Sequence, residues 1–324
     1  MSDYIYAGSK VKALEKNLLT HNQVDVLLTA KSYEEALQNL HDTFVGPYLV
    51  QNKENKIPYI LEVIIADTKK LIMSMAPEPE LLKILWLKYD FYNLAAIIKG
   101  FRMGLSNEDL KDRCFIIGNY PPLEMIESYQ NKTLGKMEFV FKKSADEATS
   151  VNEISDIDRI MNIAYLKTAK QIANESNNNF INEYVKFLID FFNIQANLRA
   201  LSYGQVGESP RPVYVYGGTV PKSATDNKET LLASISKLGS AHLWEEAVKD
   251  YKETGSYAMI ETAFDNRINS FVKEKSMEIF SIASLFAYFR AVNNNVHIIR
   301  TILVGKRSEL PEYELRKTIR QRYG

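Results

Sequence analysis

The sequence predicts an all-α protein, and three observations support this. It holds only 14 glycines and 10 prolines among 324 residues, about 7% against roughly 12% in an average globular chain. Apolar residues recur at helical spacing along most of its length. Two segments, 88–100 and 189–200, share a pattern that suits one face of a helix. Few turn-forming residues favour long helices with short connections over a sheet of many strands.

Composition places the chain among ordinary globular proteins. Apolar residues make up 46% and charged residues 25%, which excludes intrinsic disorder, and the length allows about two or three domains. Lys and Arg together number 40, as do Asp and Glu. A chain without net charge is a poor candidate for a dedicated nucleic-acid binder, whose affinity depends on neutralising phosphates. Cys114 is the single cysteine, which fits a reducing, cytoplasmic compartment.

The sequence predicts neither a signal peptide nor a membrane span. Its first residues lack the apolar core of a secretory signal. The most apolar segments are interrupted by Glu62, Lys83, Lys88 and Asp190, and none approaches 18 uncharged apolar residues. We therefore expect no direct crossing of a bilayer.

The first elements are predicted from periodicity and capping. Apolar residues at i, i+3, i+7 and i+8 within 11–19 predict a helix. Ser32, followed three residues later by Glu35, predicts a capping box at the start of the next helix. Pro58 suits the first turn of a third helix, because its missing amide would be unpaired there in any case.

The remaining helices follow from the same apolar spacing. They are predicted at residues 59–75, 79–104, 154–175, 179–202, 228–250, 256–275 and 277–304. Minor strands are predicted at 139–141 and 213–216, and loops at 118–122, 176–179 and 203–225. The last loop has the densest glycine and proline content, so it is a candidate boundary.

An internal repeat of about 100 residues recurs along the chain. Asp90-Phe91-Tyr92-Asn93 and Asp190-Phe191-Phe192-Asn193 lie 100 residues apart. Each is followed, six positions after its Asn, by a basic residue, Lys99 or Arg199. A looser copy at 291–300 keeps Asn294 and Arg300 but lacks the Asp. The repeat predicts three helical units, at residues 1–115, 116–218 and 219–324, whose segments can interleave.

The spacing of the repeat suggests a structural role. An Asp and an Asn at i and i+3 lie on one face of a helix, and the flanking aromatics predict that this face is partly buried. A buried carboxylate needs hydrogen-bond donors, and the free amides at the start of a neighbouring helix are the simplest supply. Lys99 lies nine residues after Asp90, about 900° around the helix. It therefore points away from Asp90, as Arg199 does from Asp190.

A catalytic role for Asp90 and Asp190 as an acid–base pair is the alternative. The pattern recurs without an accompanying nucleophile or histidine, so capping between helices is preferred. The four histidines and Cys114 have no metal-site spacing; the histidines are His21, His41, His242 and His297. The stretch 305–308 lacks the Gly and Ser/Thr that a phosphate-binding loop requires at 300 and 307. We expect no catalytic residues, cofactor or metal.

Several segments, taken in order, resemble the C subunit of the V-type (V/A-type) ATPases and ATP synthases, whose eukaryotic counterpart is the d subunit. The resemblance covers most of the chain. It is carried by residues 4–14, 27–35, 89–94, 189–193 and 299–323. The sequence departs from the family at 293–295, where three asparagines stand in place of a Glu-containing stretch.

The resemblance implies an all-helical funnel of three units with pseudo-threefold symmetry and a central cavity. It implies a non-catalytic central-stalk subunit, present once per complex at the cytoplasmic face of the membrane. Its implied partners are the subunits of the central shaft and the membrane rotor (proteolipid) ring. It would couple the shaft to the ring during ATP-linked proton or sodium transport, in pumping or in ATP synthesis, without binding nucleotide.

Other interpretations remain open at the level of sequence. One is a soluble all-helical scaffold or adaptor protein, and another is an enzyme with a carboxylate site near Asp90 or Asp190. The basic C-terminal stretch fits anionic head groups, acidic partner loops or an ordinary solvated helix. Its basic residues are Lys306, Arg307, Arg316, Lys317, Arg320 and Arg322.

Overall fold

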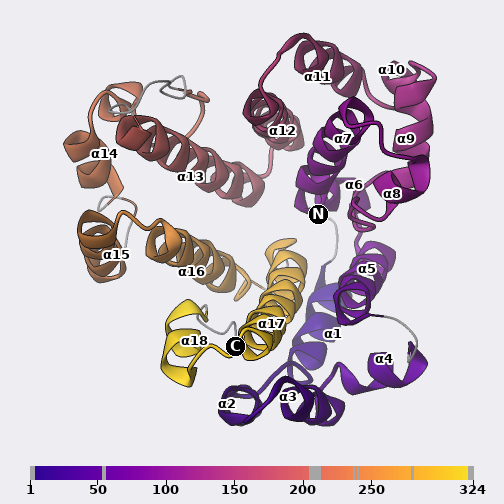
Figure 1. The fold of residues 1–324 in the computed structure, drawn as a ribbon, viewed down its shortest axis with the longest axis vertical. Helices are drawn as coiled ribbons and strands as arrows, with labels where there is room; N and C mark the ends of the chain where they lie inside the picture. Colours follow the sequence, from indigo (N-terminus) through magenta and orange to yellow (C-terminus); the bar gives the residue numbers. More distant parts are fainter. Residues whose placement is uncertain are drawn as a thin grey trace. The chain divides into compact units, whose positions relative to one another are not determined.

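All the regular structure that can be described in this computed structural model is helical. The structure describes residues 4–52, 56–203, 213–235, 238, 241–278 and 281–319, and within these ranges there is no β-strand. The predicted all-α class is confirmed. Contacts divide the chain into two compact units (Figure 1). The middle unit comprises residues 78–222, and the terminal unit comprises residues 1–77 and 223–324.

The middle unit is built around two helices that pack against each other, α7 (Leu87–Arg102) and α12 (Ile154–Ser176). α12 also contacts α11 (Phe139–Ser150) and α13 (Asn179–Tyr203). The other helices of this unit are α6 (Pro79–Leu82), η2 (Lys83–Leu85), α8 (Asn107–Lys111), α9 (Pro122–Gln130) and α10 (Leu134–Met137). Short η3 (Lys222–Thr225) follows where the chain passes back to the terminal unit.

The terminal unit has α17 (Ala283–Arg307) at its centre, in contact with α1, α3, α5, α16 and α18. Its N-terminal helices are α1 (Ile5–Glu15), α2 (His21–Thr29), α3 (Tyr33–Asn39), η1 (Leu40–Asp42), α4 (Gly46–Gln51) and α5 (Ile57–Met75). Its C-terminal helices are α14 (Lys228–Ile235), α15 (Ala241–Thr254), α16 (Ala258–Lys275) and α18 (Glu312–Thr318). Segments from both ends of the sequence therefore share one core.

Several predicted helices are confirmed with small shifts at their ends. α5, α12, α13 and α16 match the predictions within two residues at either end. Pro58 lies in the first turn of α5, as predicted. The hydroxyl of Ser32 accepts the amide of Glu35 at 3.1 Å, which confirms the N-cap. In a capping box the Glu35 carboxylate would also accept the amide of Ser32. It accepts the amide of Lys31 instead, one residue earlier, at 2.7 Å.

Other predicted boundaries were wrong. The segment 79–104 is divided at Trp86 into short helical turns and α7. The segment 228–250 forms two helices, α14 and α15. α17 begins six residues later than predicted and ends three residues later. The first predicted helix stops at Glu15, although Leu19 stays buried beyond its end.

Both predicted strands were also wrong. Residues 139–141 form the first turn of α11, because Phe141, Ala145 and Ala148 make a buried stripe at helical spacing. Residues 213–215 are not helical, but they pair with no strand. Their backbone bonds instead to asparagine side chains on α13, so side chains take the place of a neighbouring strand. Residues 204–212 of the predicted loop lie outside the described part of the chain.

Candidate functional site

Asp90 and Asn93 lie on one buried face of α7, as their spacing predicts. Both side chains are fully buried. Asn93 exchanges two hydrogen bonds with the main chain of Phe115. Its Nδ2 donates to the carbonyl at 2.9 Å, and its Oδ1 accepts the amide at 2.7 Å. A side-chain amide that satisfies both main-chain groups of one residue holds that part of the loop in place.

The Asp90 carboxylate holds the same loop five residues further on. It accepts the main-chain amide of Tyr120 at 3.1 Å and the Nδ2 of Asn119 at 2.7 Å. These donors meet the requirement of a buried carboxylate for hydrogen bonds. We call this arrangement the first clamp, formed by Asp90 and Asn93 on α7 with the loop 115–120.

α13 carries a second clamp with the same geometry. Asn193 exchanges bonds with the main chain of Val215, at 2.9 Å for the donated bond and 2.8 Å for the accepted one. Asp190 accepts the amides of Thr219 and Val220 at 2.7 and 2.8 Å, and the Thr219 hydroxyl at 2.6 Å. Asn197 adds a bond of 2.7 Å to the carbonyl of Val213.

The two clamps keep the same sequence separations. Each Asn bonds a residue 22 positions later, and each Asp bonds an amide 30 positions later. Each loop also has a glycine against the carboxylate. A Cβ would lie 2.5 Å from Oδ1 of Asp90 at Gly118, and 2.0 Å from Oδ1 of Asp190 at Gly218. The repeat seen in the sequence is therefore a repeat of tertiary contacts.

The third copy forms a partial clamp through Asn295 rather than the predicted Asn294. Oδ1 of Asn295 accepts the amide of Leu19 at 3.0 Å, and its Nδ2 donates to Ala291 at 2.7 Å. Both Asn295 and Leu19 are fully buried. The loop thus comes from the N-terminal part of the chain, and an amide stands where the other copies have a carboxylate.

The helix ends confirm that Asn295 corresponds to Asp90. Gly100 lies ten residues after Asp90, and Gly305 lies ten residues after Asn295. A Cβ at Gly100 would lie 2.1 Å from the side chain of Leu110, and a Cβ at Gly305 would lie 2.1 Å from the side chain of Leu315. Each leucine lies ten residues after its glycine. In the third copy the position matching Asn93 is held by Ile298, which has no amide side chain. The alignment on Asn294 was wrong because three consecutive asparagines left the register undefined.

The donors also differ from the prediction. Free amides at the first turn of a neighbouring helix were expected, but the donors lie just before the helix. Tyr120 and Leu19 immediately precede the N-cap residues of α9 and α2, and Val220 lies two residues before η3. The amides bound by the clamps therefore belong to the loops that lead into these helices, so each clamp fixes the point at which a helix begins.

Lys99, the basic residue of the first copy, points away from the first clamp, as predicted. Arg300 is not its counterpart in the third copy, because the register set by Asn295 places Val304 there. Lys99 pairs with Asp158 on α12. Arg300 lies near Glu62 on α5 and lowers its pKa, but burial has the larger effect and leaves the pKa of Glu62 raised. Arg102, at the end of α7, donates to the carbonyls of Ala148 and Val151, both at 2.7 Å. These contacts join neighbouring helices.

Part of the basic C-terminal stretch is used inside the terminal unit. Lys306 donates to the carbonyls of Leu28 and Ala30 at 2.6 and 2.5 Å, at the C-terminal end of α2. Arg316 pairs with Asp25 at 2.8 Å. Arg320, Arg322 and the side chain of Lys317 lie outside the described residues.

Within the part of the chain that the structure describes, the other chemically active residue types are not gathered into one site. Burial raises the pKa of the Cys114 thiol to about 11. Among the described residues, no group of three His, Cys, Asp or Glu side chains could hold a metal ion. The side chain of His242 is outside the described part of the chain. None of the described helices combines the length and the apolar character that a membrane span requires.

The fold and its contacts define an all-helical protein in which buried Asp and Asn side chains repeatedly fix the loops that lead into helices. The chain belongs to the ATP synthase (C/AC39) subunit family, whose model matches residues 7–318. The resemblance seen in the sequence is thereby confirmed.

Three relatives illustrate the family. The C subunit of the A-type ATP synthase of Methanocaldococcus jannaschii is 22% identical, with 98% of this chain and 86% of the relative covered. That of Pyrococcus abyssi is 24% identical, with 92% and 85% covered. The C subunit of the V-type sodium ATPase of Enterococcus hirae is 20% identical, with 99% of each chain covered.

Proposed function

We propose that this protein is a non-catalytic subunit of a rotary ATPase, placed between the rotating central shaft and the membrane rotor ring. In this position it passes rotation between ATP turnover and the transport of protons or sodium ions. Membership of the ATP synthase (C/AC39) subunit family supports this role. One copy per complex, at the cytoplasmic face of the membrane, belongs to the same proposal.

The recurrence of the clamps is the structural observation that carries the proposal. A part that transmits torque needs stiff packing, as close-packed helices provide. Each clamp fixes a loop through buried hydrogen bonds, which resist local opening. A mechanical connection requires helices whose first turns are held rigidly, and it does not require a reactive pocket.

The pairing of the clamps also supports three repeats at residues 1–115, 116–218 and 219–324. Asp90 of the first repeat holds Tyr120 of the second, and Asp190 of the second holds Val220 of the third. Asn295 of the third repeat holds Leu19 of the first. The first repeat is thus linked to both of the others. We propose that the three repeats enclose a cavity that receives the shaft.

Co-purification tests the function. The tagged full-length chain, expressed in its source cells, is recovered from detergent-solubilised membranes, and the bound proteins are identified by mass spectrometry. The proposal predicts recovery of both the shaft subunits and the rotor-ring subunit. Recovery of neither, with the chain folded and abundant, would contradict it.

A further inference from the structure

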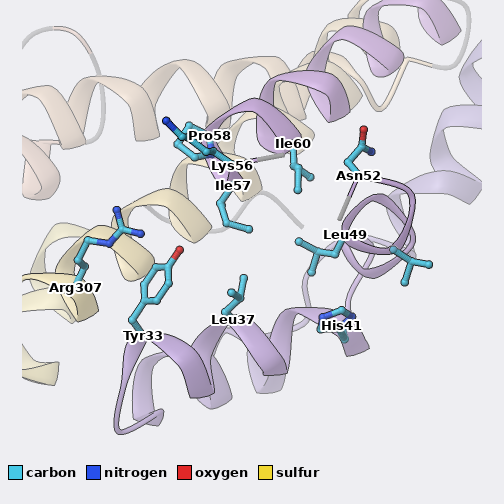
Figure 2. A pocket seen from close by; sticks show the side chains of 11 residues that line it. Tyr33, Leu37, His41, Leu49, Asn52, Lys56, Ile57, Pro58, Ile60 and Arg307 are labelled. Atoms are coloured by element: carbon cyan, nitrogen blue, oxygen red, sulfur yellow. The ribbon is translucent and has the colours of Figure 1, made fainter. Parts of the chain in front are cut away.

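A groove in the terminal unit is used by no contact described above. It lies between α3, α4, α5 and the end of α17 and has a volume of about 640 Å³. Its apolar lining includes Leu37, Leu49, Ile57 and Ile60, and Figure 2 shows Leu37 and Ile57 pointing into the space between the helices. We call it the α3–α5 groove.

The charges at the edge of the groove are positive. Arg307 and Lys56 line it, and both are exposed. The guanidinium of Arg307 lies over the ring of Tyr33, 4.6 Å from its centroid, so the ring orients the charge at the opening (Figure 2). No Asp or Glu is among the described residues that line the groove.

A neighbouring pocket shares Tyr33 and Arg307 with this groove, but it carries charges of both signs. Its lining adds Lys31 and Lys306 and also Glu34 and Glu309. The described charged residues that line the α3–α5 groove are all positive. The groove thus has an apolar lining and positively charged side chains at its edge. Such a surface is complementary to a segment that carries apolar residues on one side and carboxylates beside them.

We propose that the α3–α5 groove binds an acidic amphipathic helix of a partner protein, through aliphatic side chains at i, i+3 or i+4, and i+7. Its carboxylates would meet Arg307 and Lys56. A helix suits the site because grooves formed between helices accept a row of apolar anchors of this spacing. Binding of anionic lipid is less well supported, since it usually relies on clusters of four to eight basic residues and the whole chain has no net charge.

This inference rests on the proposed function in one respect, namely that the helix belongs to another subunit of the same complex. A photo-reactive amino acid at Val50, a groove residue that is 55% exposed, is activated in the purified complex. The same amino acid at Met277, which is 75% exposed and does not line the groove, is the control. The cross-linked peptides are identified by mass spectrometry.

The expected result is one cross-linked helix, with aliphatic residues on one face and Asp or Glu beside them, from Val50 and not from Met277. Arg307→Glu should lower the yield of that cross-link at least tenfold, and Arg307→Lys should retain most of it. Lys249→Glu, on α15 outside the groove, should leave it unchanged. Circular dichroism checks that each variant is folded.

The outcomes separate the two proposals. If the complex is recovered but Val50 cross-links only lipid, nothing, or a segment without acidic residues, the groove proposal fails and the coupling function stands. An Arg307→Glu variant that cross-links as well as the wild type would also overturn it. If no complex is recovered with the unmodified chain, both proposals fail.

Discussion

Gly218 lies so close to Asp190 that a Cβ at Gly218 would fall 2.0 Å from a carboxylate oxygen. Real Cβ atoms do not approach an oxygen to this distance, so a side chain there would push the loop off the carboxylate. The glycine thus lets the amides of Thr219 and Val220 reach Asp190. Gly118 has the same relationship to Asp90 at 2.5 Å.

Replacement of Gly218 by alanine should therefore weaken the second clamp. We expect Gly218→Ala to lower the free energy of unfolding by about 2–3 kcal/mol, through the overpacking of a buried contact. Urea denaturation followed by circular dichroism measures the change. Gly135→Ala is the matched control, because the new Cβ would meet only the flexible chain of Lys142 at 3.2 Å. If both variants are equally stable, the close approach has no structural importance.

Removal of the Asp190 carboxylate tests the second clamp at its acceptor. Asp190→Ala leaves the amides of Thr219 and Val220 and the Thr219 hydroxyl without their acceptor. The expected loss of stability is about 3–5 kcal/mol, since each buried donor left unpaired costs about 1–3 kcal/mol. Asp190→Asn should lose less, because its amide oxygen still accepts one bond. Equal losses of stability in Asp190→Ala and Asp190→Asn would show that the hydrogen bonds to these donors do not stabilise the loop.

The same variants separate a structural role from a catalytic one. We expect Asp90→Asn and Asp190→Asn to reduce stability or assembly without removing an activity of the isolated chain. The measurement is turnover by the purified wild-type chain, with the variants as controls. Turnover that is lost in the variants at unchanged stability would support the enzyme interpretation instead.

Asn295 should hold the N-terminal segment against α17. Asn295→Ala removes the acceptor of the Leu19 amide, so the expected loss of stability is about 1–3 kcal/mol. Hydrogen exchange of residues 17–20 should become faster, while exchange in the middle unit stays unchanged. Asn162→Ala, which removes an exposed side-chain bond on α12, should change stability by less than about 0.5 kcal/mol. Unchanged exchange at Leu19 in Asn295→Ala would be inconsistent with the third clamp.

Glu62 gives a prediction about pH. Burial raises its pKa in the folded protein, and Arg300 opposes the shift. A raised pKa means that the protonated form favours folding, so this contribution is present at low pH and is lost as the pH rises through the folded-state pKa. Glu62→Gln should therefore raise the melting temperature more at pH 8 than at pH 4.

Glu127 is exposed, so Glu127→Gln is the control and should show no such difference. Arg300→Met should raise the pKa of Glu62 further and so increase the effect of Glu62→Gln. A larger stabilisation by Glu62→Gln at pH 4 than at pH 8 would have the wrong sign and would contradict the burial argument.

The helical class and the buried Asp and Asn faces could be predicted because both depend on local spacing. Asp90 and Asn93 lie three residues apart, and periodicity alone places them on one side of a helix. The binding of these side chains to the loop 115–120 was not predicted, because 22 to 30 residues separate the partners. One signal was available: Gly118-Asn119-Tyr120-Pro121 and Gly218-Thr219-Val220-Pro221 lie 100 residues apart, as the Asp residues do.

The third clamp could not be predicted in the same way. Asn293, Asn294 and Asn295 are consecutive, so the sequence leaves three registers open. The choice depends on the packing of α17 against α1, which brings Leu19 to Asn295 from 276 residues away. The loop around Leu19 also lacks the Gly and Pro that mark the other two.

The division of predicted helices likewise reflects tertiary packing. Trp86 separates η2 from α7 and is completely buried, and the gain from burying a large aromatic side chain exceeds the small cost of a break in the helix. Periodicity reports apolar spacing on both sides of such a break and does not show the break itself.

Rotation with the shaft is the central claim, and a covalent link tests it most directly. The chain is cross-linked through introduced cysteines to a subunit of the central shaft in the purified, membrane-reconstituted complex, and ATP hydrolysis and ion pumping are measured before and after reduction. If the two parts turn together, both activities remain near the level of the unlinked complex. Arrest of both activities by the cross-link, with recovery on reduction, would contradict the account.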